Sequence, residues 1–390
     1  MPPFDHAEYG QRLARVKDRM AELGIDVHVA ANPANMGWLT GYDGWSFYVP
    51  QAVIVAADHD EPIWIGRGMD ANAARVTTFL KDENIIPYPD DYVQNRDKHP
   101  MNFIADFVAE KGWDKAAIGT EMDAYYYSAR GHAALVADLP NATFTDTTTL
   151  VNWCRVIKSD AEIGYMQDAA RIIQNMIQTA YGVIAPGVRQ CDAAAAIHKV
   201  QIEGTPEFGG EYSAIAPMLP TGVGTSTPHL TWNDSPFKAG EATILELAGT
   251  RNRYHAPMSR TLHLGPPPQK LADTAKVVIE GIDIALAAAK PGALCEEVEA
   301  AWTKHINAHG VFKDSRLGYS IGLAYPPDWG EHTLSLRPGD KTELRPGMTI
   351  HLMPGIWLDD WGVEISEPFR ITETGAETFC NFPRDLFVKD

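Results

Sequence analysis

The first 150 residues alternate helical and strand-like patterns of apolar positions. The opening helical pattern closes on Gly24, a typical C-cap, and residues 32–44 indicate a turn-rich connection. Turn-forming residues between two apolar runs near residue 60 predict a hairpin. The pattern indicates a small mixed α/β domain. We predict helices at 7–24, near 101–112 and at 130–140, and strands at 25–31, 49–57, 61–66 and 116–121.

The second half has longer helical patterns. Ser159 is a good N-cap, and Glu162 stands at the capping-box position of the helix that follows it. The periodicity alone indicates an α+β protein. We place the domain boundary so that the domains are 1–155 and 156–390. The predicted helices are 156–185, 190–204, 271–289 and 294–309, and the predicted strands lie around 212–217, 242–249, 348–357 and 363–371.

Composition narrows the class of protein. A chain of 390 residues is longer than one core usually grows, which agrees with two domains. The net charge of −18 argues against a nucleic-acid partner or an anionic membrane surface. We expect a cytoplasmic protein, because no membrane span or signal-peptide pattern is found. Its four cysteines show no spacing typical of zinc or redox sites, so we expect free thiols.

Residues 246–261, ELAGTRNRYHAPMSRT, carry the most specific pattern of the chain. They resemble the segment D-x-G-x5-Y-x2-D-x2-R-T of the creatinase/prolidase/methionine aminopeptidase family, whose two Asp residues bind a metal pair. Tyr254, Arg260 and Thr261 match this frame. Glu246 and Pro257 stand at the two Asp positions, and a Pro side chain cannot bind a cation.

The family's three other ligand positions are altered as well. Tyr319 replaces the His of G-H-x-x-G, Met353 replaces the Glu of E-P-G, and Ser366 replaces the Glu of the closing I-E-D. Divalent metals need several carboxylate or imidazole ligands. Of the five positions only Glu246 can serve, so we predict a site without a metal and without a cofactor.

The resemblance also implies a fold and an assembly. The family has a pita-bread catalytic domain, in which two αββ units surround a curved antiparallel sheet, after the small N-terminal domain. Its members commonly form homodimers, in which an N-terminal loop reaches the partner's pocket. Here that loop carries Trp45 and Phe47, which we expect to contact the substrate.

Two residues are the first candidates for catalysis. Glu246 lies in the apolar run ATILELAG, where a carboxylate is costly unless it is paired or used. It either attacks the substrate or activates water, and the alternative is a buried ion pair with Arg260 or Arg253. His229 precedes this strand in a loop, where the family has a His that contacts the substrate or shuttles a proton. A surface His without such a role is the alternative.

Further candidates follow from their places in the same motifs. Tyr319 is suited to donate a hydrogen bond to a leaving nitrogen, or else fills the volume of the lost ligand. We expect Glu364 to contribute to catalysis and Glu367 to binding, unless either is a surface residue. Aromatic faces bind delocalised cations, although at least half of these aromatic residues are expected to serve packing. The remaining predicted binding residues are Trp232, Tyr254, Arg260, Tyr325 and Trp357, with Trp329 and Trp361 nearby.

The segments around these positions most closely resemble the branch of the family that hydrolyses the osmolyte ectoine. This implies a small zwitterionic substrate, whose cyclic amidine is opened to N-acetyl-2,4-diaminobutyrate. The catalytic Glu positions of creatinase are Ser259 and Met353 here, which disfavours creatine as the substrate. The alternatives are a metal-dependent proline peptidase or osmolyte lyase of the same fold, a creatinase-like enzyme, and a non-catalytic binding protein.

Overall fold

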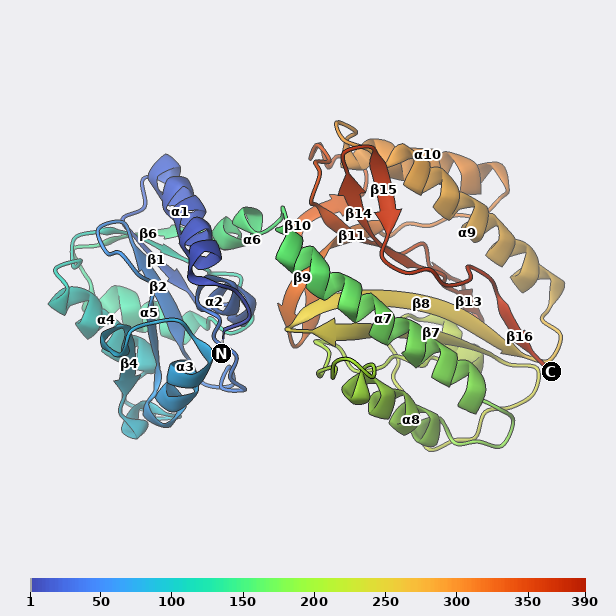
Figure 1. Ribbon diagram of the computed structural model, residues 1–390, viewed down its shortest axis with the longest axis horizontal. Coiled ribbons are helices and arrows are strands. Elements are labelled where there is room, and N and C mark those ends of the chain that lie inside the picture. Colours follow the sequence, from blue (N-terminus) through green and yellow to red (C-terminus); the bar gives the residue numbers. More distant parts are fainter. Residues whose placement is uncertain (1) are drawn as a thin grey trace. The chain divides into compact units, whose positions relative to one another are not determined.

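The computed structural model describes residues 2–390 and divides into two compact units, which meet in sequence between Arg155 and Val156. Figure 1 shows each unit as a sheet covered by helices. Each unit has its own hydrophobic core. No helix among the described residues is long and apolar enough to cross a membrane.

The N-terminal unit contains a six-stranded mixed sheet in the order β4-β3-β2-β1-β5-β6. Strand β1 pairs antiparallel with β2 and parallel with β5, so the sheet combines a hairpin side with a parallel side. Its strands are β1 Val27–Ala30, β2 Ala52–Ala56, β3 Ile63–Arg67, β4 Ile85–Tyr88, β5 Ala117–Thr120 and β6 Thr143–Asp146. Its helices are α1 His6–Leu23, α2 Pro33–Thr40, α3 Ala71–Thr77, α4 Pro100–Glu110, α5 Ala129–Asp138 and α6 Leu150–Cys154.

The local signals in this unit predict some elements and miss others. Helix α1 ends at Gly24 in the left-handed conformation, and β2 and β3 form the predicted hairpin. The prediction of a turn-rich connection was wrong, because this segment contains helix α2. All residues of α2 are buried, so its sequence shows no polar face. The buried carboxylate of Glu121 stabilises its start by accepting hydrogen bonds from the backbone N–H groups of Ala31 and Asn32 at 2.7 and 2.6 Å.

The C-terminal unit repeats one order of elements, a pair of helices followed by an antiparallel pair of strands. The first set is α7 Asp160–Val183, α8 Gln190–Glu203, β7 Ala242–Arg251 and β8 Tyr254–Leu264. The second set is α9 Gln269–Ala288, α10 Cys295–Ala308, β9 Gly318–Tyr325 and β10 Asp328–Leu336. The chain closes with β11 Thr349–Leu352, β12 Ile356–Trp357, β13 Gly362–Val363, β14 Glu367–Thr372, β15 Gly375–Thr378 and β16 Phe387–Lys389.

One curved sheet joins the two sets. Its order is β15-β14-β11-β9-β8-β16, with β7 paired to β8 and β10 paired to β9. Figure 1 shows α7 and α8 over the β7 and β8 side, and α9 and α10 over the side of the later strands. This is the predicted arrangement of two units around a curved sheet.

Helix α7 begins and packs as its sequence dictates. Ser159 and Glu162 form the predicted capping box. Its packing on β7 depends on Gly249, since a Cβ atom there would lie 2.0 Å from the carbonyl oxygen of Ala169. The glycine of the ELAG motif therefore serves close contact between helix and sheet.

Three predicted strands differ from the structure. Residues 212–217 form no strand and are held instead by a hydrogen bond, 2.9 Å long, from the N–H of Ala214 to Nε2 of His255. The strand predicted around 348–357 breaks at Pro354, which has no N–H for a ladder. The strand predicted around 363–371 breaks at residues 364–366, which bend into the site described below. The cysteines are free thiols: Cys295 and Cys380 are buried, and Cys154 and Cys191 are half-buried.

Candidate functional site

Glu246 lies in the middle of strand β7 of the C-terminal unit. Its backbone pairs with Met218 on one side, and it stands opposite Ser259 of β8 on the other. The residue is only 4% exposed. Its Oε2 atom has no hydrogen-bond partner among the described residues. A carboxyl group so placed is costly for folding, which points to a use in function.

A second carboxyl group, that of Glu364, lies beside the first. Thr261 holds the backbone of Glu364 on both sides: its hydroxyl donates to the Glu364 carbonyl oxygen at 2.8 Å and accepts from the Glu364 N–H at 2.9 Å. Glu364 is fully buried, and apart from the neighbouring Ser259 hydroxyl its carboxyl oxygens lack a hydrogen-bond partner among the described residues. The β8 strand thus carries the residues that face both carboxyl groups.

Burial and proximity change the acidity of this pair. Burial, reinforced by the charge of Glu364, raises the pKa of Glu246 well above its ordinary value. Burial raises the pKa of Glu364 to about 7, although the positive charge of Lys313 and the nearby Ser259 hydroxyl oppose the shift. Two adjacent buried carboxyl groups cannot both be charged at low cost, so near neutral pH they hold a proton between them. Such a pair can act as both an acid and a base.

Lys313 is the residue whose positive charge acts on the carboxyl group of Glu364. The sequence patterns did not identify it. Burial lowers the pKa of its ammonium group to about 8. The group donates to the carbonyl oxygen of Gly355 at 3.0 Å and lies 4.5 Å from the centre of the Trp357 ring. Trp357 therefore contacts a cation of the protein itself.

A chain of buried polar side chains passes through two of the altered ligand positions. The indole N–H of Trp329 donates to the Tyr319 oxygen at 2.7 Å, and that oxygen lies 3.1 Å from Nδ1 of His351. Nε2 of His351 lies 2.7 Å from the Ser366 hydroxyl oxygen, which also accepts from the Ser259 N–H at 2.7 Å. His351 thus connects Tyr319 to Ser366.

The members of this chain are uncharged near neutral pH. Burial, aided by the positive charge of Arg316, lowers the pKa of His351 to about 3. Burial, and next the negative charge of Glu246, raises the pKa of Tyr319 well above its ordinary value. His351 was missed by the sequence analysis. Its signal was a polar residue inside the apolar run Met348–Met353, two positions before the altered E-P-G motif.

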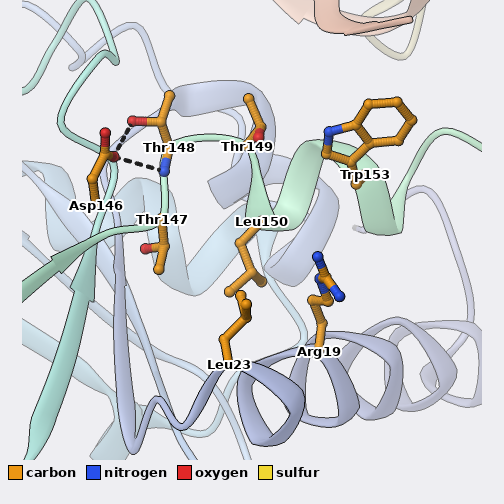
Figure 2. Close-up of a pocket in the computed structure, with 8 residues that line it drawn as sticks. All are labelled: Arg19, Leu23, Asp146, Thr147, Thr148, Thr149, Leu150 and Trp153. Carbon is orange, nitrogen blue, oxygen red and sulfur yellow. Dashed lines mark hydrogen bonds between the residues drawn. The ribbon is translucent and has the colours of Figure 1, made fainter. Parts of the chain in front are cut away.

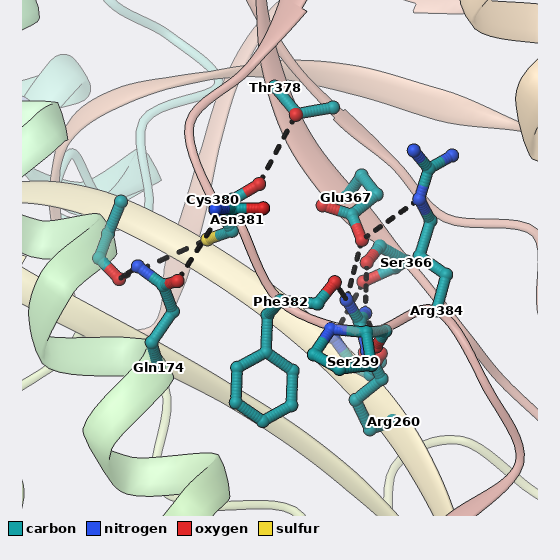
Figure 3. Close-up of polar contacts among 12 residues, drawn as sticks. Gln174, Ser259, Arg260, Ser366, Glu367, Thr378, Cys380, Asn381, Phe382 and Arg384 are labelled. Atoms are coloured by element: carbon teal, nitrogen blue, oxygen red, sulfur yellow. Dashed lines mark hydrogen bonds and ion pairs between the residues drawn. The ribbon is translucent and has the colours of Figure 1, made fainter.

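Arg260 and Glu367 form a buried ion pair, drawn in Figure 3, with a separation of 2.6 Å. The other guanidinium N–H groups donate to the backbone carbonyl oxygens of Ser259, Ser366, Phe382 and Pro383. All five N–H groups are therefore engaged within the protein. In this arrangement Arg260 has no donor left for a substrate, and the pair instead fastens the 366–367 segment to β8.

The other predicted site residues lie in varied surroundings. His229 is exposed in the loop before β7, and no hydrogen bond joins its ring to Glu246 or Tyr319 in residues 2–390. The Tyr254 hydroxyl donates to the buried carboxylate of Glu162 at 2.6 Å, which fastens β8 to α7. Trp232 packs at the edge of the core under α7 and α8, and Tyr325 is buried near Arg253. In the N-terminal unit Trp45 is 59% exposed, whereas Phe47 is buried against it.

The donor set does not fit the metal pair that the family resemblance would imply. Tyr319 and Ser366 are tied to His351 by hydrogen bonds, and both ring nitrogens of His351 are engaged. Within the part of the chain that the structure describes, no group of three or more His, Cys, Asp or Glu residues is placed to hold a metal ion.

Two surface cavities lie elsewhere in the fold. One in the N-terminal unit, of about 220 Å³ and shown in Figure 2, is lined by Arg19, Leu23, Leu150, Trp153 and the polar segment 146–149. Another in the C-terminal unit, of about 270 Å³, is lined by residues including His263, Lys270 and Trp361. Neither is lined by Glu246, Glu364 or Tyr319. The carboxyl pair is therefore distinct from both.

Comparison with known proteins identifies the family of this chain. Residues 164–373 match the family model "Metallopeptidase family M24", and residues 12–157 match "Creatinase/Prolidase N-terminal domain". The chain is 50% identical to the ectoine hydrolase of Halomonas elongata, over 99% of this chain and 98% of that protein. These matches confirm the predicted family.

Solved structures agree on the fold. A prolidase from Thermococcus sibiricus matches with a TM-score of 0.84 and 18% identity, over 98% of this chain and 99% of that one. A dipeptidase from Pyrococcus horikoshii matches with a TM-score of 0.81 and 20% identity, over 97% of this chain and 100% of that one. The predicted fold class is confirmed.

The raised pKa of Glu364 predicts a dependence of stability on pH. Its folded-state pKa of about 7 exceeds the ordinary 4.5, so the folded protein keeps a proton that the unfolded chain releases. The stabilisation by this proton is fully present below the pKa of the unfolded chain and is lost as pH rises through the pKa of the folded protein. A shift of this size corresponds to roughly 3 kcal/mol. We expect the free energy of unfolding of the wild type, relative to Glu364→Gln, to fall by that order between about pH 5 and pH 8. Urea unfolding of both proteins at several pH values measures this difference. The same pH dependence of the free energy of unfolding in the wild type and in Glu364→Gln would contradict the prediction.

Proposed function

The chain belongs to the metallopeptidase family M24 and is a hydrolase, and we propose that it opens the cyclic amidine ring of ectoine to N-acetyl-2,4-diaminobutyrate. The observation that carries this proposal is a buried pair of carboxyl groups: Glu246, at a metal-ligand position of the family frame, and Glu364 beside it. The full-length identity of 50% to an ectoine hydrolase supports it.

The chemistry of an amidine suits a site of this kind. The amidinium carbon is already activated by its positive charge, so a Lewis acid is not required to polarise it, unlike the carbonyl of a peptide. The reaction needs a nucleophile and a group that manages protons. We therefore propose that this enzyme works without a metal ion, because Pro257, Tyr319, Met353 and Ser366 replace the ligands of the family.

Glu246 is the proposed nucleophile or base. In one route its carboxylate attacks the amidinium carbon and forms a covalent intermediate, which water then hydrolyses. In the other it deprotonates the attacking water directly. The carboxyl group of Glu364, beside Glu246, can hold the proton that the two groups share. His229 remains a predicted proton shuttle, which from its exposed loop position would require the loop to approach the substrate.

The substrate and the metal are tested together. We expect purified protein to convert ectoine, but neither creatine nor X-Pro dipeptides, and to keep its turnover after EDTA treatment. Elemental analysis should find well under one transition metal per chain. Two metal ions per chain with turnover that EDTA abolishes would contradict the metal-free mechanism, and conversion of X-Pro dipeptides alone would contradict the substrate.

Glu246→Gln tests the central residue. The variant should fold yet lose about 10² to 10⁴-fold in turnover, because general base or covalent catalysis contributes about that factor. The matched control is Glu331→Gln, since Glu331 is also buried in this unit but pairs with Lys158 at 2.6 Å. The control should lose stability while its turnover per folded molecule stays close to that of the wild type. Equal turnover in folded Glu246→Gln would remove Glu246 from the mechanism.

Assembly as a homodimer is a further part of the proposal, supported by the exposed indole of Trp45 in the N-terminal unit. If a loop of one protomer completes the pocket of its partner, Trp45→Ala should raise KM for ectoine while the mass found by light scattering remains that of a dimer. A monomeric wild type with full activity would contradict this assembly.

A further inference from the structure

The buried chain from Trp329 to Ser366 has two ends whose donors are fixed. An indole N–H and a backbone N–H can only donate. The Tyr319 oxygen therefore accepts from Trp329, and the Ser366 oxygen accepts from the Ser259 N–H. What remains to be arranged are the two hydroxyl protons and the one ring proton of a neutral His351.

Those three protons have two consistent arrangements. In the first, Tyr319 donates to Nδ1, and the Nε2–H of His351 donates to Ser366, whose own proton is directed elsewhere. In the second, Ser366 donates to Nε2, and the Nδ1–H donates to Tyr319, whose own proton is directed elsewhere. Both arrangements are neutral, and both satisfy the observed distances of 3.1 and 2.7 Å on the two sides of the ring. A shift between them moves a proton along the chain without leaving a charge inside the protein.

We propose that His351 is the positioning residue of a proton relay from Ser366 to Tyr319, through which Tyr319 protonates the departing ring nitrogen of the substrate. This inference rests on the proposed function for the identity of that nitrogen. The geometry of the relay does not depend on it.

The relay balances as follows. As the bond between carbon and ring nitrogen breaks, its electron pair stays on the nitrogen, which takes the Tyr319 hydroxyl proton. Tyr319 takes the Nδ1 proton of His351, and Nε2 takes the Ser366 hydroxyl proton. Ser366 is reprotonated through the Ser259 hydroxyl, which passes on a proton from the carboxyl group of Glu364, and Glu364 becomes a carboxylate. In the covalent route, water later attacks the intermediate, its proton enters at Tyr319, and the same steps in reverse return a proton to Glu364. In the route with Glu246 as base, Glu246 takes the proton of water and returns it to Glu364 within the pair.

Contacts at the two ends suit these roles. Ser259 lies between Ser366 and Glu364: its N–H holds the Ser366 hydroxyl oxygen in place at 2.7 Å, and its own hydroxyl, beside the Glu364 carboxyl group, is the group that passes the proton between them. Tyr319 is near enough to Glu246 for that charge to raise its pKa. The relay therefore begins at one carboxyl group of the pair and ends close to the other.

Nuclear magnetic resonance of ¹⁵N-labelled histidine tests the relay without any substrate. Tyr319→Phe removes the partner of Nδ1, so the His351 proton should move to Nε2, where Ser366 accepts it. Ser366→Ala removes the partner of Nε2, so the proton should move to Nδ1. Opposite tautomers in the two variants are the expected result, with the His351 signals assigned from His351→Gln. The same tautomer in both variants would overturn the relay.

Kinetics test its use in catalysis. His351→Phe and His351→Gln should lower the single-turnover rate on ectoine by about 10²-fold, the lower range for acid–base catalysis, with KM little changed. In mixtures of H2O and D2O the wild-type rate should depend non-linearly on the deuterium fraction, because several protons move together, and the variants should lose this curvature.

The matched control is His255→Gln. His255 is also fully buried and neutral, but its nitrogens bond the Ala214 N–H and the Arg253 carbonyl oxygen. This variant should lose stability and keep the curvature. Folded His351 variants with the wild-type rate and curvature would overturn the proposal. A wild type that leaves ectoine unchanged would instead contradict the proposed function, while the tautomer measurement would still decide on the relay.

Discussion

The burial of two carboxyl groups side by side, Glu246 and Glu364, is the constraint on which the rest of the C-terminal unit depends. Each charge is costly in a dry interior, and the two repel each other, so the folded state keeps a proton between them. A protein tolerates this cost only where the surrounding structure fixes the groups. The sheet does so through β8, because Ser259 faces Glu246 and Thr261 clamps the backbone of Glu364.

The Arg260–Glu367 pair extends the same scaffold. Arg260 follows Ser259 on β8, and its guanidinium group joins the carboxylate of Glu367 to four carbonyl oxygens around it. A buried charge pair of this kind contributes geometric definition more than net stability. Its effect here is to hold residues 364–366 out of the strand ladder, and so to aim Glu364 into the interior. The R-T pair of the family motif thus acts on the site through the backbone.

The sequence predicted the fold well where local chemistry determines the structure. It predicted less well where contacts between distant segments bury an element. Gly24, Ser159 and Glu162 mark helix ends by local chemistry, and each acts as expected. Helix α2 was missed because a helix buried on all sides has no polar face to reveal its period. The motif identified Glu246, Tyr319 and Ser366, but the contacts of His351 and Lys313 join segments far apart in the chain, which periodicity does not report.

The four altered ligand positions have one common consequence for the site. A metal pair organises a site by drawing several charged ligands to one point, and their replacement by Pro257, Tyr319, Met353 and Ser366 removes that charge. The space is organised instead by directional hydrogen bonds among neutral groups, with His351 between Tyr319 and Ser366. Neutral groups that are already engaged in hydrogen bonds to one another can pass protons at little electrostatic cost. An amidinium carbon is already activated by its charge and needs proton transfer rather than further polarisation, so the substitutions agree with the proposed substrate.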